Sequence, residues 1–378
     1  MATEAPFPQQ EYLDRYERAY ALMERDGLDA LMVSGRDNYW YFTGLISYQF
    51  DHLMRPQICF LPKGGKPFVL VYGNEKAKAQ ALPWIGKVKS YVDVPFPQEM
   101  IADCLKEMGL AEGRLGFELG EDQRLGFPVN YLSRLSEALP KAKIRDGSPA
   151  LCELRIIKSA LEVDAMRRAC EISMKAYDHC LPQLRPGITR REVAERLFIA
   201  MIEEGANPRT PGFLMLNAST AYDDRRYERG DRMVADFGAC YAGYFGDITR
   251  MAIFGPPSTE QKKEHQAAWD LIRRCFDAMK PGTPIAELSR IANRELEQRG
   301  YPKVESPKRI GHGIGLARAE PPSLNEVEKE LYRPGMILAL EPKVRTQKGS
   351  VHLEEDVLIT QGGAEFLTSG AGELRAIE

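Results

Sequence analysis

The chain has 378 residues, which is enough for two domains that each bury a core of their own. Its 51 basic and 54 acidic residues leave a net charge of −3, which argues against a nonspecific nucleic-acid binder. No apolar run approaches a membrane span, and Met1–Pro6 has neither the basic nor the apolar part of a leader. Seven scattered cysteines without a CxxC pair are typical of a reduced, cytoplasmic protein.

The first part of the sequence alternates between helical and extended patterns. An amphipathic pattern predicts a helix over 10–26, and a buried strand over 28–34 follows it. The aromatic cluster Asn38–Gly44 comes next and fits either a packed strand end or the wall of a substrate pocket. A hairpin turn at 62–66 and further alternating elements predict an α/β domain over residues 1–148.

The second part, residues 149–378, combines helices with antiparallel hairpins, which is an α+β pattern. Helices are predicted over 153–182, over Thr189–Glu204 with a capping box at its start, and over 260–279 and 284–299. Two hairpins in this domain carry acidic residues within apolar strands, and one histidine stands alone between them.

The first acidic hairpin places two carboxylates together. A two-residue turn at Tyr241–Ala242 sets Asp236 directly opposite Asp247, so both side chains lie on one face. The apolar residues around them predict a buried strand, where opposed carboxylates repel each other. A positive charge is therefore required between them.

The second hairpin repeats this arrangement. A turn at Gln347–Lys348 sets Glu341 opposite Glu354, and His312 lies in the glycine-rich segment Gly311–Gly315. Two divalent cations about 3.5–4 Å apart would offset both pairs. Carboxylates with one imidazole suit Mn, Fe, Co or Zn. The sequence thus predicts two divalent metal ions in one site, with the ligands Asp236, Asp247, His312, Glu341 and Glu354.

These motifs together resemble a known family. Asp-x-Gly with a second Asp eleven residues later, Gly-His-Gly-x-Gly, Leu-Glu-Pro and Glu-Asp-Val are similar to peptidase family M24, the pita-bread fold of creatinases, prolidases and aminopeptidase P. The resemblance covers the whole chain, with a creatinase/prolidase-type N-terminal domain and a pita-bread catalytic domain.

The resemblance also implies roles for individual residues. Asp247 and Glu354 would bridge the two ions, Asp236 would bind one ion, and His312 with Glu341 would bind the other. A hydroxide bridging the metals would be the nucleophile, and Glu341 its proton acceptor. The family further implies a homodimer and a small-molecule or dipeptide-like substrate.

This sequence departs from the peptidase pattern at the flanking histidines. Lys308 stands four residues before the metal histidine, Ala319 stands seven residues after it, and no histidine occurs around Asn217–Thr220. In the peptidases these imidazoles hold the scissile carbonyl, so their loss removes transition-state stabilisation for amide cleavage. The resemblance is therefore to a divergent member with a complete metal site.

Other side chains can take over substrate binding. Arg318 and Lys308 are suited to a substrate carboxylate, although surface ion pairs are an equal alternative. His352 stands where relatives keep an arginine and either supports Glu354 or acts in the chemistry. The catalytic candidates are Glu341, His352 and Arg318, and the substrate-binding candidates are Tyr41, His52, Arg55, Lys308 and Arg318.

Three functions remain open at this stage. The first is a dinuclear metal-dependent hydrolase of the Xaa-Pro peptidase or creatinase type, acting on a small C–N-bonded substrate. The second is a C–S lyase of the dimethylsulfoniopropionate type, in which the metals hold a carboxylate while a base removes an α-proton. The third is a non-catalytic binding member of the fold, although such members commonly lose ligands that this chain retains.

Overall fold

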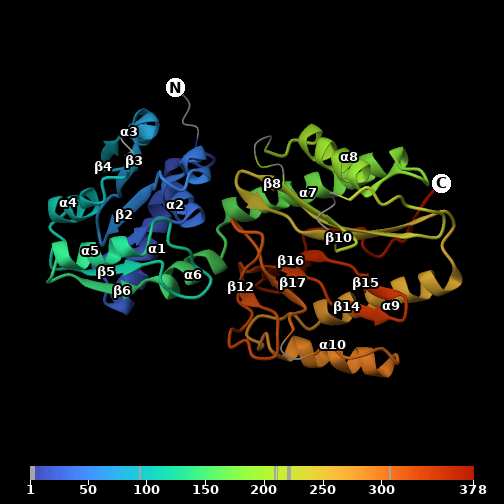
Figure 1. The fold of residues 1–378 in the computed structure, drawn as a ribbon. Coiled ribbons are helices and arrows are strands. Elements are labelled where there is room, and N and C mark those ends of the chain that lie inside the picture. Colours follow the sequence, from blue (N-terminus) through green and yellow to red (C-terminus); the bar gives the residue numbers. More distant parts are fainter. Residues whose placement is uncertain (1–4, 93–94, 208–209, 211, 219–222, 306–307) are drawn as a thin grey trace. The chain divides into compact units, whose positions relative to one another are not determined.

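The computed structural model describes residues 5–92, 95–207, 210, 212–218, 223–305 and 308–378. The chain forms two compact units, Met1–Arg155 and Ile156–Glu378 (Figure 1). The units divide between Arg155 and Ile156, at the end of helix α6 (Ser148–Ile156), whereas the division expected at 148/149 lies at the start of that helix. The long helix predicted over 153–182 is in fact two helices, and all but the last residue of α6 belongs to the first unit.

The first unit contains a six-stranded mixed sheet with the order β4-β3-β2-β1-β5-β6. Every residue of the central strand β1 is buried, as expected for a strand covered on both faces. The predicted α/β class is confirmed. Its elements are α1 (Gln9–Asp26), β1 (Ala30–Val33), α2 (Arg36–Thr43), η1 (Tyr48–Asp51), β2 (Ile58–Pro62), β3 (Phe68–Tyr72), η2 (Gly73–Glu75), α3 (Lys76–Gln80), β4 (Lys87–Tyr91), α4 (Glu99–Glu107), β5 (Arg114–Phe117), α5 (Asn130–Ala138) and β6 (Lys143–Asp146).

The aromatic cluster Asn38–Gly44 is helical rather than a strand end. It forms most of α2, which ends at Gly44 in the left-handed conformation that glycine accepts readily. Tyr41 is only 1% exposed, with the Arg15 guanidinium 4.3 Å above its ring and its hydroxyl donating to the Leu154 carbonyl. Tyr41 therefore packs inside the first unit, which corrects its assignment as a substrate-binding residue.

The second unit contains two five-stranded sheets, each packed against two helices. The first has the order β18-β10-β8-β7 with β9 paired to β8, and the second has the order β12-β11-β13-β16-β17. One core joins α7 and α8 to the first sheet, and another joins α9 and α10 to the second. The elements are α7 (Ala160–Cys180), η3 (Leu181–Gln183), α8 (Arg190–Glu203), β7 (Gly212–Leu216), β8 (Arg232–Tyr241), β9 (Tyr244–Phe245), β10 (Ile248–Phe254), α9 (Thr259–Phe276), α10 (Glu287–Gln298), β11 (Gly311–Gly313), β12 (Glu320–Ser323), β13 (Ile337–Leu340), β14 (Lys343–Thr346), β15 (Gly349–His352), β16 (Glu355–Thr360), β17 (Gly363–Phe366) and β18 (Arg375–Ile377).

The first acidic hairpin turns one residue later than predicted. Its turn is Ala242–Gly243, where φ is 48° and 84°, instead of Tyr241–Ala242. Positive φ at both central residues is what a type I′ turn requires, and glycine satisfies it readily. The pairing therefore shifts by two residues, so that Asp236 lies opposite Thr249 and not opposite Asp247. A two-residue shift keeps every side chain on its predicted face.

The second acidic hairpin has the predicted turn at Gln347–Lys348. The pairs on either side, Leu340 with Glu355 and Lys343 with His352, keep one register. Glu341 therefore lies across from Glu354 in that register, as predicted. Among the helices that the structure describes, none is both long and apolar enough to cross a membrane.

An isolated β-bridge between Thr249 and Glu354 links the two sheets of the second unit. Thr249 belongs to β10, and Glu354 lies between β15 and β16. The Arg250 guanidinium reinforces this junction by donating to the Glu354 carbonyl at 2.8 Å and to the Glu355 carboxylate at 2.7 Å. The fold thus brings the two acidic hairpins together at one edge.

Candidate metal centre

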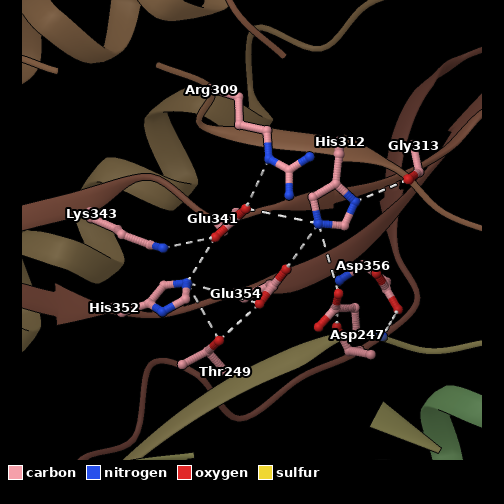
Figure 2. A network of polar contacts seen from close by, with 11 residues as sticks. Asp247, Thr249, Arg309, His312, Gly313, Glu341, Lys343, His352, Glu354 and Asp356 are labelled. Carbon is pink, nitrogen blue, oxygen red and sulfur yellow. Dashed lines mark hydrogen bonds and ion pairs between the residues drawn. The ribbon is translucent and has the colours of Figure 1, made fainter. Parts of the chain in front are cut away.

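Four of the five predicted ligands, Asp247, His312, Glu341 and Glu354, converge at this junction (Figure 2). Nε2 of His312 lies 3.7 Å from Asp247 Oδ2, 3.8 Å from Glu341 Oε1 and 4.0 Å from Glu354 Oε1. These four residues come from different segments: the residue before β10, the strand β11, the end of β13 and the residue before β16. The imidazole is therefore surrounded by carboxylates from both hairpins.

Two overlapping groups of side chains have the spacing needed to hold a metal ion. Asp247, His312 and Glu354 form one group, and Asp236, His352 and Glu354 form the other, with ligand atoms within 4.8 Å of one another in each. Glu354 belongs to both groups, which is the position of a bridging ligand. Asp236 is thereby brought to the site despite the shifted register.

The buried carboxylates fit a cation. Asp247 is 3% exposed and Glu354 is 1% exposed. Burial, reinforced by repulsion from neighbouring carboxylates, raises the pKa of both groups well above the usual range. Oδ1 of Asp247 is buried and receives no hydrogen bond from the part of the chain that the structure describes. A cation would satisfy that oxygen and relieve the repulsion, so the donor set fits the divalent metals that the sequence predicts.

His312 has the form that a metal ligand needs. Its Nδ1 lies 2.9 Å from the Gly313 carbonyl oxygen, so an Nδ1–H that donates there leaves the Nε2 lone pair facing the carboxylates. Burial lowers the pKa of the His312 imidazole and favours its neutral form. The neutral ring with a free Nε2 is the metal-binding tautomer.

Buried side chains hold the carboxylates in place. Thr249 donates its hydroxyl to Glu354 Oε2 at 2.8 Å. Oδ2 of Asp356 accepts the Asp247 backbone N–H at 2.8 Å and the Cys170 thiol at 3.2 Å, and burial raises the pKa of Asp356 to about 7. Sequence reasoning missed Thr249 as a supporting residue, although its place two residues after Asp247 puts it on the same strand face.

Besides His312, three nitrogen-bearing side chains contact Glu341. Nε2 of His352 and Nζ of Lys343 each lie 3.1 Å from Oε2, and Nε of Arg309 lies 3.8 Å from Oε1. Burial raises the pKa of Glu341, but the His352 hydrogen bond and the Lys343 charge outweigh it and hold that pKa at about 2. Arg309 and Lys343 were not predicted. Their only sequence signal is that each lies within three residues of a predicted ligand.

The structure separates the two cations predicted to bind a carboxylate. Lys308 forms an ion pair with Glu305, and its side chain is 55% exposed. Arg318 is exposed, stacks its guanidinium 4.6 Å from the Phe213 ring centroid, and is close enough for its charge to lower the pKa of His312. Arg318 therefore stays a substrate-binding candidate, while Arg309 rather than Lys308 faces the centre.

His52 and Arg55 belong to the first unit, where each contacts an aromatic ring. His52 is exposed, with its ring edge toward Tyr48, and the Arg55 guanidinium lies 4.3 Å from the Tyr72 ring centroid. Arg55 also donates to Gln49 Oε1 at 3.1 Å. The assignment of His52 and Arg55 to substrate binding stays a prediction.

The fold and this centre define a metal-dependent enzyme with an α/β unit followed by an α+β unit that carries the ligands. Two family models match the sequence: Metallopeptidase family M24 over residues 164–361, more than half of the chain, and Creatinase/Prolidase N-terminal domain over residues 15–157. The chain belongs to metallopeptidase family M24, and it is a metallohydrolase of that family. The predicted family and pita-bread fold class are confirmed.

Relatives match nearly the full length of the chain. The Xaa-Pro dipeptidase of Pyrococcus furiosus is 27% identical over 381 residues, covering 96% of this chain and 99% of that protein. A dipeptidase structure from Mycobacterium ulcerans is 26% identical with a TM-score of 0.81, covering 98% and 99% of the two chains. The fold is also similar to a prolidase from Thermococcus sibiricus, with a TM-score of 0.84 at 24% identity over 97% and 99% of the chains.

Proposed function

We propose that this chain is a dinuclear metal-dependent hydrolase that cleaves a small C–N-bonded, dipeptide-like substrate. The observation that carries the proposal is the pair of ligand groups that share Glu354. The similarity to the Xaa-Pro dipeptidase of Pyrococcus furiosus supports a substrate of this size and bond type. Mn, Co, Fe and Zn are all compatible with these ligands.

The ligands divide the work of the centre. Glu354 and Asp247 would bridge the ions, Asp236 would hold one of them, and His312 with Glu341 would hold the other. Two ions bound by these residues would lower the pKa of a bound water molecule toward neutrality. Glu354 and Asp247 reach their ionised form because bound cations favour it, which reverses the effect of their burial.

Glu341 is the proposed proton acceptor. Its low pKa keeps the carboxylate ionised at neutral pH, which is the form that accepts a proton or binds a cation. Lys343 and His352 fix its Oε2 on one side, and Arg309 approaches Oε1 on the other. The carboxylate is thus held in one orientation at the centre, and both of its oxygens face hydrogen-bond donors.

Cationic side chains favour a substrate with an acidic group. Arg309 and Lys343 are about half exposed, with 46% and 47% of their side chains accessible, so their charges face both Glu341 and solvent. Arg318 adds a third exposed cation near Asp236 and His312. These charges attract a substrate carboxylate toward the ligands and compensate in part for the flanking histidines that this sequence lacks.

A substrate screen tests the proposal. The protein is loaded in turn with Mn, Co, Fe and Zn and is given Xaa-Pro and other dipeptides, guanidino acids and sulfonium acids. We expect an amine and an acid as products from a C–N-bonded substrate, with turnover that a chelator abolishes and metal restores. Hydrolysis that continues at full rate in the metal-free protein would contradict the proposal.

Elimination is the second candidate, and one observation favours it. Of the four histidines of the second unit, only His312 and His352 belong to the ligand groups. Amide hydrolysis develops an oxyanion that further imidazoles would stabilise, whereas elimination relies on a base that removes an α-proton. A sulfonium acid that yields acrylate and a thioether in the same screen would select the lyase.

Assembly and location complete the proposal. We expect a homodimer, as the family resemblance implies, and light scattering on the purified protein tests it. Six of the seven cysteines are buried, which agrees with a reduced, cytoplasmic setting.

A further inference from the structure

We propose that His352 is itself a metal ligand, so that each of the two ions receives one imidazole. The inference rests on the proposed two-metal function and goes beyond it, because the ligand set predicted from sequence gives His352 no bond to metal. In that set, the ion at Asp236 would be bound by carboxylates alone. Here the ion at Asp236 is bound by Nε2 of His352 as well.

The position of His352 on its strand supports this role. His352 ends β15 and lies two residues before Glu354, and alternate residues of an extended chain point to one face. Its side chain therefore points the same way as that of the bridging carboxylate. Only 8% of the residue is exposed, so the ring occupies the interior of the site rather than its rim.

The contacts of the His352 ring nitrogen resemble those of the predicted ligand His312. Nε2 of His352 lies 3.1 Å from Glu341 Oε2 and 3.9 Å from Glu354 Oε2, and the Thr249 hydroxyl lies 3.4 Å away (Figure 2). Nε2 of His312 is likewise surrounded by carboxylate oxygens, at 3.7–4.0 Å. In each case one nitrogen is surrounded by oxygens that a cation binds.

The competing role for His352 is a hydrogen bond that only orients Glu341. That role uses Nε2–H as a donor to one carboxylate. It does not explain why the same ring has ligand atoms within 4.8 Å of both Asp236 and Glu354. A cation among these three groups would take the Nε2 lone pair instead, and the neutral ring would then carry its proton on Nδ1.

The extra nitrogen changes the metals that the centre prefers. Imidazole suits Zn, Fe, Cu and Ni, whereas carboxylate and water suit Mg, Ca and Mn. With one imidazole on each ion, the centre should favour zinc, iron or cobalt over manganese at both positions. A centre in which His352 is not a ligand should instead have one oxygen-only position that accepts manganese.

A structure of the zinc-loaded full chain gives the first test. Crystals loaded with two equivalents of Zn²⁺ are measured at the zinc absorption edge, which locates the ions independently of activity. We expect two zinc positions, with His352 Nε2 about 2.0–2.1 Å from one of them. Two ions with His352 still donating to Glu341 would overturn the inference and leave the proposed function intact. Fewer than two ions would refute the two-metal centre itself, and this inference with it.

Metal competition in solution gives the second test. His352→Phe keeps the ring volume but removes the donor, and it should weaken the second zinc ion by at least about 10- to 100-fold, the range known for loss of even an indirect partner. His352→Asp returns an oxygen ligand, so it should still bind two ions while its preference for zinc over manganese falls. An unchanged preference in His352→Asp would show that the ring acts only through Glu341. His179→Gln, which alters an exposed histidine outside both groups, is the control and should match the unaltered protein.

Discussion

The two ligand groups share Glu354 but differ in their surroundings. Asp247 and His312 are buried among carboxylates, and no lysine or arginine forms an ion pair with Asp247 in the described part of the chain. In the outer group (Asp236, His352 and Glu354), Asp236 is only partly buried, and the charges of Lys343 and Arg318 lower its pKa against the effect of burial. The deep group (Asp247, His312 and Glu354) therefore depends on a metal for charge balance. The outer group already has cationic side chains of the protein near it.

The largest expected effect separates the two groups directly. Asp247→Ala should abolish both metal uptake and turnover, because it removes a bridging ligand and one wall of the deep group. Asp236→Ala, as the matched variant in the outer group, should lose one ion and keep the other. Metal analysis after gel filtration, together with turnover of the best substrate, checks both. Normal turnover by Asp247→Ala would refute its bridging role.

The stability of the metal-stripped protein should depend on pH. Burial raises the folded-state pKa of Asp247 and Glu354, and raises that of Asp356 to about 7, above the values near 4 of an unfolded chain. A raised folded-state pKa gives stability that is fully present below the unfolded pKa and is lost as the pH rises through the folded pKa. The stripped protein should therefore lose roughly 1.4 kcal/mol per pH unit through Asp356 between about pH 4 and 7, and Asp247 and Glu354 should change its stability in the same direction.

Bound metal should cancel this loss. Urea unfolding at pH 5 and at pH 8, with chelator and with saturating metal, measures the difference. We expect the chelated protein to be weaker at pH 8 than at pH 5, and the metal-loaded protein to be at least as stable at pH 8. Equal stability of the chelated protein at both pH values would show that the folded-state pKa values of Asp247, Glu354 and Asp356 are not raised.

The sequence predicted which residues form the centre better than it predicted their geometry. The five candidate ligands could be named because buried acidic residues on apolar strands need a cation, and the family motifs specify their order. The strand partner of Asp236 could not be predicted, because it depends on which two residues form the turn, and it is Thr249 instead of the expected Asp247. Ala242 adopts positive φ there, which nothing in the residue type favours.

The supporting residues depend on contacts between segments far apart in sequence. Arg309 and Lys343 reach Glu341 only after β11, β13 and β14 have assembled, so no local pattern indicates them. Tyr41 was misassigned for a related reason. An aromatic cluster has the same composition in a helix core as in a pocket wall, and only the tertiary structure shows which it is.

Substitution of Arg318 should have an effect of intermediate size, and it tests whether an exposed cation near Asp236 binds the substrate. Arg318→Met should raise KM for an acidic substrate several-fold without changing the metal content, since an exposed charge pair contributes roughly 0.2–1 kcal/mol. The KM of Arg318→Lys should lie between those of Arg318→Met and the unaltered protein, because lysine keeps the charge but loses the planar guanidinium. Steady-state kinetics with a substrate and its uncharged amide give the comparison. Equal effects on both substrates would mean that Arg318 supports the fold through Phe213 and binds no carboxylate.

The smallest expected effect comes from two neighbouring cations that point in different directions. Lys308 pairs with Glu305 at the surface, whereas Arg309 approaches Glu341, so adjacent residues of similar charge have different surroundings. Lys308→Met should leave turnover, KM and metal content unchanged and alter the free energy of unfolding by less than about 1 kcal/mol. Arg309→Met should raise KM for an acidic substrate modestly, because it removes a half-exposed cation that lies 3.8 Å from Glu341 Oε1. A larger effect from Lys308→Met than from Arg309→Met would show that Lys308, as predicted from the sequence, and not Arg309 binds the substrate.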